Sequence, residues 1–198
     1  MSITGSEQLS PISVEDYLAG ELQARRKHEY VDGQIYAMVG GRYSHNLIST
    51  NVVSELHRQL KNSPCRALNS DSKVRVQASS KTSFYYPDVS VVCGDNIRND
   101  VFQDKPAVVV EVLSTGTRRI DEGEKRQAYL QLDSLTAYIM IEQDFAAATI
   151  YQRVDDEFQK AIRQGLVATI ELPEIAVTLS LSDVYANVQF QPETDPDE

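Results

Sequence analysis

The stretch Ala107-Val-Val-Val-Glu-Val-Leu113 decides the fold class of this chain of 198 residues. It is mostly Val, and it predicts a short strand buried on both faces, which is typical of a sheet covered by helices. Glu111 interrupts the apolar run. An ionised carboxylate buried there is costly unless it is paired, bound to a metal or neutral. Glu111 therefore has a partner in the fold, or it lies near the surface at the end of the strand.

A second acidic residue stands at the start of a predicted strand. Pro87-Asp88 opens the run Asp88–Cys93; proline is tolerated at the first position of a strand, whereas aspartate is depleted in strands. If this strand is the neighbour of the first, Asp88 and Glu111 meet at one edge of the sheet. Two carboxylates suit Mg²⁺, which takes few protein ligands and keeps several waters. On these residues alone, an Asp88 that only solvates the start of the strand is an equal alternative.

A helix is expected directly after the Glu111 strand, over Thr117–Leu132. Asp121, Lys125 and Tyr129 are spaced by four residues and therefore lie on one face of it. Because only the short turn at 114–116 separates the strand from the helix, Lys125 could bring a positive charge beside the two carboxylates. The alternative is an ordinary exposed Asp–Lys pair, which contributes little to stability.

The remaining patterns predict helices and strands in mixed order. Ser13 is a typical N-cap of a helix, and Asp32-Gly33 is a typical two-residue hairpin turn. The other expected elements are a long amphipathic helix over Ser44–Lys61, strands over Lys73–Gln77, Ala137–Glu142, Ala147–Val154 and Phe158–Ile162, and a short helix over Leu181–Tyr185. This order predicts an α/β domain with a mixed, partly parallel central β-sheet flanked by helices.

The composition is that of an ordinary globular domain. Hydrophobic residues make up 41% of the chain and charged residues 24%, which excludes a disordered or fibrous protein. No segment approaches the roughly 20 apolar residues of a membrane span, and the N-terminus lacks the pattern of a signal peptide. We therefore expect a cytoplasmic protein without a membrane partner, with a single domain over residues 1–190 and an acidic tail over 191–198.

The net charge of −10 limits the partners that the chain can bind. Tight nonspecific binding to DNA depends on the neutralisation of phosphates by Lys and Arg, so an acidic body argues against it. A nucleic-acid partner would have to be bound by local basic patches.

Cysteine and histidine supply no other obvious chemistry. Cys65 and Cys93 are too few for a disulfide framework, and we expect both to be small buried thiols in a reducing compartment. His45 and His57 lie twelve residues apart, roughly 120° around a helix, so they cannot share a zinc ion through one helix face. His45 could approach the sheet edge, but its position favours a structural role at the start of the helix.

The ordered set Pro87-Asp88, Glu111-Val-Leu-Ser114 and the Asp121, Lys125, Tyr129 stripe resembles the PD-(D/E)XK, or restriction-endonuclease-like, superfamily. More narrowly, it resembles the bacterial Uma-two family, which is grouped with the endonucleases. Further matching segments are Glu29–Gly33, Ser44-His45, Tyr138–Ile141 and Leu179–Tyr185. The resemblance implies a restriction-endonuclease-like core and a hydrolase that cleaves nucleic acid, most naturally DNA.

The resemblance also implies roles for individual residues. Asp88 and Glu111 would bind Mg²⁺ or Mn²⁺, with the backbone carbonyl of Val112 completing part of the coordination. The superfamily places its lysine two residues after the acid, where this chain has Leu113. The family resemblance implies that the lysine has moved to the following helix, which fits Lys125. Lys125 would then orient the attacking water or stabilise the transition state.

Three further residues are candidates at this site. Glu29 resembles an acidic residue that related nucleases contribute from near their first helix, and it could be an outer metal ligand; a solvated Glu beside a hairpin is an equal alternative. Arg118 and Arg119 could hold phosphates if they flank Glu111. Nucleases that cut both strands often pair protomers, so a homodimer is compatible with this function.

Two other functions remain open on the sequence. Leu113 and the net charge of −10 would also suit a nuclease fold that has lost activity and serves as a binding module for nucleic acid or protein. A metal-dependent hydrolase of another phosphoester is the third candidate, because a fold does not dictate its substrate.

Overall fold

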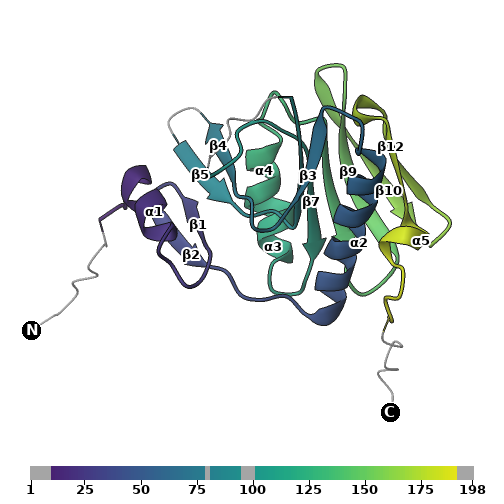
Figure 1. Ribbon diagram of the computed structural model, residues 1–198, viewed down its shortest axis with the longest axis horizontal. Coiled ribbons are helices and arrows are strands. Elements are labelled where there is room, and N and C mark those ends of the chain that lie inside the picture. Colours follow the sequence, from purple (N-terminus) through teal and green to yellow (C-terminus); the bar gives the residue numbers. More distant parts are fainter. Residues whose placement is uncertain (1–9, 79–80, 95–100, 191–198) are drawn as a thin grey trace, which may run out of the picture.

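The computed structural model describes residues 10–78, 81–94 and 101–190, and its centre is a mixed six-stranded sheet between helices (Figure 1). The strand order is β10-β9-β8-β7-β6-β3. The strands are β3 (Cys65–Asn69), β6 (Val89–Cys93), β7 (Pro106–Leu113), β8 (Ala137–Glu142), β9 (Ala147–Val154) and β10 (Glu157–Gln164). The predicted α/β class is therefore confirmed. The acidic tail predicted over 191–198 lies outside the described residues.

Strand β7 lies inside this sheet, parallel to β8 and antiparallel to β6. Its alternate residues from Val108 to Val112 pack in the main core, beneath α2 (Tyr43–Gln59). Leu113 points to the opposite face and packs with Tyr129 in a second core cluster. Because side chains alternate along a strand, Glu111 also points to this second face.

The helix expected over residues 117–132 is present, but a π-helical turn interrupts it. It consists of α3 (Arg118–Ile120), the π-helical segment η1 (Asp121–Lys125) and α4 (Arg126–Tyr129), which follow one another directly. Figure 1 shows this helix and α2 on either side of β7. Asp121, Lys125 and Tyr129 are all buried, so the predicted stripe does face the protein interior. Single π turns within α-helices are frequent at functional sites.

A second sheet packs beside the first, with the strand order β2-β1-β5-β4. Its strands are β1 (His28–Val31), β2 (Gln34–Ala37), β4 (Val74–Ala78) and β5 (Lys81–Tyr85), and α1 (Val14–Glu21) accompanies it. Ser13 caps α1, accepting a hydrogen bond from the Asp16 N–H. Asp32 and Gly33 form the predicted hairpin turn with φ values of 48° and 90°. Positive φ at both positions is typical of a type I′ turn.

The C-terminal part of the described chain closes the main core. It contains the hairpin of β11 (Thr169–Leu172) and β12 (Val177–Ser180), with the 3₁₀ turn η2 (Pro173–Ile175) between them, and then α5 (Leu181–Val184). Asn51 of α2 donates hydrogen bonds to the carbonyl oxygens of Val184 and Ala186 at 3.0 and 2.9 Å. Among the described residues, no helix combines the length and apolar character needed to span a membrane.

The expectation of two free buried thiols is wrong. Strands β3 and β6 pair antiparallel with Cys65 opposite Cys93, and the two residues form a disulfide. Directly opposed residues of antiparallel strands have close β-carbons, so the strand register supplies a proximity that a count of cysteines cannot reveal. Cys93 is also exposed rather than buried.

The hairpin turn makes a prediction about stability. A Cβ on Gly33 would lie 2.6 Å from the Pro11 Cβ, at a φ of +90° that side chains rarely adopt. Gly33→Ala should therefore lower the free energy of unfolding by about 1–3 kcal/mol, measured by urea denaturation. The matched control is Gly20→Ala in α1, where no atom lies within 4 Å of the new Cβ. That variant should gain about 0.5–1 kcal/mol. Equal effects of the two substitutions would contradict this account of the turn.

Candidate active site

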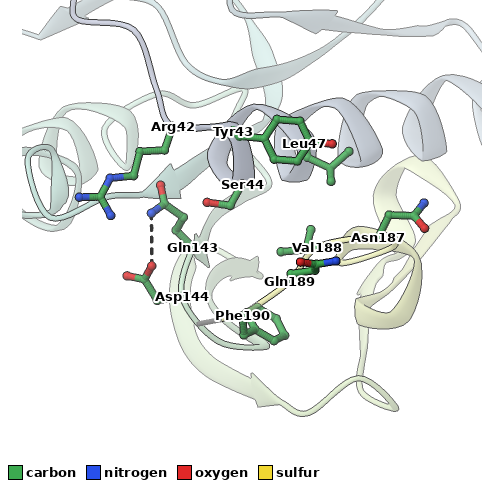
Figure 2. A pocket seen from close by; sticks show the side chains of 10 residues that line it. All are labelled: Arg42, Tyr43, Ser44, Leu47, Gln143, Asp144, Asn187, Val188, Gln189 and Phe190. Carbon is green, nitrogen blue, oxygen red and sulfur yellow. Dashed lines mark hydrogen bonds between the residues drawn. The ribbon is translucent and has the colours of Figure 1, made fainter. Parts of the chain in front are cut away.

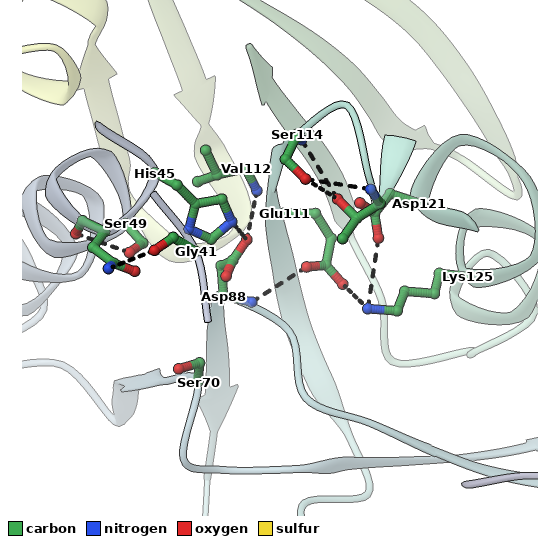
Figure 3. Close-up of polar contacts among 12 residues, drawn as sticks. Gly41, His45, Ser49, Ser70, Asp88, Glu111, Val112, Ser114, Asp121 and Lys125 are labelled. Carbon is green, nitrogen blue, oxygen red and sulfur yellow. Dashed lines mark hydrogen bonds and ion pairs between the residues drawn. The ribbon is translucent and has the colours of Figure 1, made fainter. Parts of the chain in front are cut away.

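The antiparallel pairing of β6 and β7 brings the start of β6 beside the end of β7, which places Asp88 next to Glu111. The Val112 N–H donates a hydrogen bond to Asp88 Oδ2 at 2.7 Å, and the Asp88 N–H donates to Glu111 Oε2 at 3.3 Å. Figure 3 shows the Glu111 carboxylate between Asp88 and Lys125. The prediction that the two strands are neighbours is confirmed.

Lys125 reaches the two strands from the π-helical segment that covers this face. Its Nζ lies 2.8 Å from Glu29 Oε1, 3.4 Å from Glu111 Oε1 and 3.5 Å from Asp121 Oδ1. The same Glu29 oxygen accepts a hydrogen bond from the Tyr86 N–H at 3.1 Å. One buried ammonium group is therefore shared by three carboxylates from β1, β7 and η1.

Burial and crowding shift the protonation of this cluster. Burial raises the pKa of the Glu111 carboxyl well above its usual value; the charge of Lys125 opposes the shift, and the carboxylates of Asp121, Asp88 and Glu29 add to it. Burial likewise raises the pKa of Asp121, against the charge of Lys125. Burial lowers the pKa of Lys125, but its three carboxylate partners outweigh burial, so the net pKa is raised. The site has more carboxylates than Lys125 can neutralise, which favours the binding of a further cation.

His45, in the first turn of α2, contacts the site from the opposite side. Its Nε2 lies 3.2 Å from Asp88 Oδ2. Burial lowers the pKa of the imidazole, but the hydrogen bond and the charge of Asp88 outweigh burial, so the net pKa is raised. A Cβ on Gly41 would lie 2.7 Å from His45 Nδ1, so the glycine leaves room for the ring. His45 thus does more than begin a helix, because it helps to hold the Asp88 carboxylate in place.

These side chains line a cavity of about 520 Å³. The segment 36–42, which leads from β2 into α2, forms one wall, and the β7–α3 loop 114–117 forms another. Tyr36 and Val39 are exposed on the first wall, and Ile120 is exposed near the second. The cavity therefore combines acidic groups with an apolar, open rim.

The donor set can be tested against the metal that the family resemblance implies. Within the described ranges, no group of three or more His, Cys, Asp or Glu side chains is arranged to hold a metal ion. A structural zinc site needs four such ligands, so these residues do not form one. Asp88 and Glu111 offer hard oxygens, and Mg²⁺ binds through one or two carboxylates together with waters and substrate phosphates. Asp121 Oδ1 is buried and accepts no hydrogen bond from the described residues, and its ion pair with Lys125 Nζ is long, at 3.5 Å. The residues present therefore fit Mg²⁺ or Mn²⁺.

The two arginines proposed for phosphate binding lie outside this cavity. Arg118 Nη1 donates to Glu142 Oε1 and to Glu122 Oε1, both at 3.0 Å. Arg119 is exposed and has no ion-pair partner in the part of the chain that the structure describes. Neither residue lines the cavity, so its geometry gives no support to their predicted role.

Two features of the site lie beyond the sequence patterns. The contact of His45 with Asp88 joins residues 43 positions apart, and the only local signal is Gly41, which a close approach of the ring requires. The π turn over residues 121–125 has no recognisable sequence signal here. Spacing by four still places Asp121 and Lys125 together, because both point toward β7.

Comparison with known proteins gives a family match. Residues 14–183 match the family model Uma2, described as "Putative restriction endonuclease". Two uncharacterized proteins of Synechocystis sp. PCC 6803 are similar. The first, slr1290, is 32% identical over 180 residues, which cover 90% of this chain and 94% of the relative. The second, sll1609, is 28% identical over 148 residues, which cover 73% and 82% respectively.

The fold also has a counterpart among solved structures. A crystal structure of "a putative nuclease belonging to DUF820" from Anabaena variabilis superimposes with a TM-score of 0.68 at 17% sequence identity. The match covers 89% of this chain and 98% of the other. The predicted nuclease-like core is therefore confirmed as a fold.

The charge of the cluster makes a prediction about stability. The folded protein binds a proton at Glu111 more tightly than the unfolded chain does, because its folded pKa is raised. The contribution of Glu111 to the free energy of unfolding should therefore rise as pH falls from neutral through the folded pKa, and level off below the unfolded pKa of about 4.3. Glu111→Gln should make the metal-free protein about 1 kcal/mol more stable at pH 7 and remove this pH dependence. Urea denaturation at several pH values measures both.

The control is Glu55→Gln on α2. The Arg58 hydrogen bond lowers the pKa of Glu55, so the contribution of this carboxyl is present at neutral pH and is lost as pH falls. Its substitution should cost up to about 1 kcal/mol at pH 7, the opposite sign. If Glu111→Gln instead costs about 3–5 kcal/mol, Glu111 is a structural partner of Lys125 and the strained-site interpretation is wrong.

Proposed function

Because the chain belongs to the Uma2 family, as its motifs predicted, we propose that it is a metal-dependent nuclease that hydrolyses phosphodiester bonds of nucleic acid. The observation that carries the proposal is the meeting of Asp88 and Glu111 at the junction of β6 and β7, with the buried Lys125 ammonium beside them. A pair of carboxylates and a lysine in an open cavity is a set of groups that phosphodiester hydrolysis can use.

In this proposal, Asp88 and Glu111 hold Mg²⁺ or Mn²⁺. When bound, such an ion lowers the pKa of a coordinated water and neutralises charge on the attacked phosphate. The chain fixes both ligands in advance: the Val112 N–H and His45 hold Asp88, and Lys125 holds Glu111. Ligands that are already oriented need no rearrangement when the substrate arrives.

Lys125 has two roles in the proposal. Its charge opposes the rise in the pKa of Glu111, and so favours the ionised carboxylate that a cation requires. It is also a fixed positive group beside the position at which negative charge develops on the phosphate. Glu29 and Asp121 orient the ammonium. Glu29 remains a candidate outer ligand, although its Oε1 serves Lys125 and the Tyr86 N–H here.

The position of Leu113 bears on the alternative of an inactive binding module. Leu113 lies on the same face of β7 as Glu111 and is fully packed against Tyr129. A lysine at 113 would have to leave this apolar contact to reach the carboxylates. Lys125 approaches the same face from the helix, which supports the proposal that the departure from the superfamily pattern is compensated.

Metal-dependent cleavage is the direct test of this proposal. The protein should cleave at least one of plasmid DNA, single-stranded DNA and RNA when Mg²⁺ or Mn²⁺ is present, and none when the metal is chelated. Asp88→Asn, Glu111→Gln and Lys125→Met should each reduce kcat/KM by at least about a hundredfold, the scale of removing one fixed charge or donor from a transition state. Gel assays of matched protein preparations measure the rates.

Thermal melts separate failure of binding from failure of chemistry. Mn²⁺ should raise the melting temperature of the wild type by mass action, and it should have no effect on Glu111→Gln. The control Glu174→Gln removes an exposed carboxylate on η2 and should keep both cleavage and the metal response. Cleavage by Glu111→Gln at the wild-type rate, or a wild type indifferent to both metals, would contradict the proposal.

A further inference from the structure

A second cavity, of about 630 Å³, lies next to the catalytic one. The two cavities share Arg42 and Gln143 in their walls. The second is lined on the α2 side by Tyr43 and Leu47 and on the other by the stretch 187–190, which follows α5 (Figure 2). The proposed chemistry uses none of these residues.

The wall between the two cavities is suited to an anion. Helix α2 begins there, its N-cap Arg42 makes no side-chain capping hydrogen bond, and its first turn contains no acidic residue. The free N–H groups and the dipole of a 17-residue helix attract negative charge at this end. The Arg42 guanidinium is exposed and has no ion-pair partner within the described residues. A phosphate here would meet a helix N-terminus and an arginine together.

Gln143 supplies an independent sign of a ligand at the same place. Its side chain follows β8, is only 4% exposed and borders both cavities. Its Nε2 donates to Asp144 Oδ1 at 3.3 Å, whereas its Oε1 has no hydrogen-bond partner among the described residues. Figure 2 shows the amide lying between Arg42 and Asp144. A buried acceptor of this kind takes its donor from outside the chain, and because it borders both cavities, the amine of a base or the hydroxyl of a sugar can supply that donor.

Each cavity also has an exposed aromatic ring. Tyr36 lines the catalytic cavity and is 55% exposed, and Tyr43 lines the second and is 81% exposed. Exposed tyrosine rings stack on nucleic-acid bases whose faces are free, whereas the bases of a duplex stack on one another. The net charge of −10 offers no broad basic surface for the two backbones of a duplex.

We infer that the second cavity is a nucleotide-binding subsite and that the substrate is a single strand or an unpaired segment of nucleic acid. This inference rests on the proposed function. A nucleotide next to the scissile phosphate enters the second cavity and stacks on Tyr43. The phosphate that joins the two positions lies at the start of α2 beside Arg42. Gln143 Oε1 accepts a hydrogen bond from the base or the sugar.

Fluorescence anisotropy without metal tests binding apart from cleavage. Fluorescein-labelled short DNA and RNA single strands, and the same strands annealed to their complements, are titrated with the protein in EDTA. At least one single strand should bind about tenfold more tightly than its duplex. Tyr43→Ala should weaken that binding by about tenfold, the effect of losing one stacked base, and Tyr43→Phe should stay within about twofold because the ring remains.

Gln143→Leu separates a binding role from a structural one. It removes a buried unpaired acceptor, so the variant should melt no lower than the wild type and yet bind the single strand several-fold more weakly. Glu174→Gln, the exposed substitution on η2 described above, is the control and should change neither property.

The outcomes distinguish the subsite from the proposed function. The subsite is overturned if no single strand binds, if the duplex binds as tightly, or if Tyr43→Ala binds as the wild type does; metal-dependent cleavage would then stand by itself. If binding depends on Tyr43 but no nucleic acid is cleaved with any metal, the subsite stands and the nuclease proposal falls.

Discussion

The burial of Glu111 in an otherwise apolar strand is the constraint on which the arrangement of the candidate site depends. A buried acid is costly unless it is paired, bound to a metal or neutral, and here a counter-charge arrives on the same face of the sheet. The turn after β7 is short enough for the following helix to return over that face, and Lys125 then lies 3.4 Å from Glu111. The opposite face of β7 is left to α2 and remains wholly apolar. The apolar core beneath α2 is therefore separated from a second face, on which the charged cluster lies beside the apolar cluster around Tyr129.

Much of this arrangement can be read from the sequence, because it rests on local periodicity. The Val-rich runs predict β6 and β7, and the spacing of Asp121, Lys125 and Tyr129 places the three residues on one face of the following helix. Long-range relations are harder to predict. The disulfide depends on the register of β3 against β6, and β3 itself has no clear alternation of apolar residues. The contact of His45 with Asp88 depends on how α2 lies across the sheet, which no local pattern specifies.

The arginines show that the placement of charged side chains is also difficult to predict from the sequence. Arg118 and Arg119 stand close to Glu111 in sequence, and nearness along the chain suggests a place in the site. In the fold, Arg118 turns toward Glu142 at the end of β8, because Glu111 points from strand β7 into the cavity whereas Arg118 stands on the separate helix α3 and does not line that cavity. Arg42 is far away in sequence, yet it reaches the cavity because α2 begins at its edge. An acidic protein can thus place a cationic side chain at the edge of a cavity, although its overall composition gives no sign of one there.

The π turn has a consequence for how this chain can change over evolutionary time. A turn of this kind holds one residue more than an α-helical turn, and each residue of an α-helix advances the chain by about 100°. The helix is anchored at both ends, by the Ser114–Thr117 turn before it and by Tyr129 in the core after it. Deletion of one residue between these anchors would rotate one end of the helix by about 100° relative to the other, so the side chains at the two ends could no longer both face the protein interior. Single substitutions on the outer side of the helix do not change the angle between its two anchored ends. We therefore expect this helix to tolerate substitutions on its outer side much better than insertions or deletions.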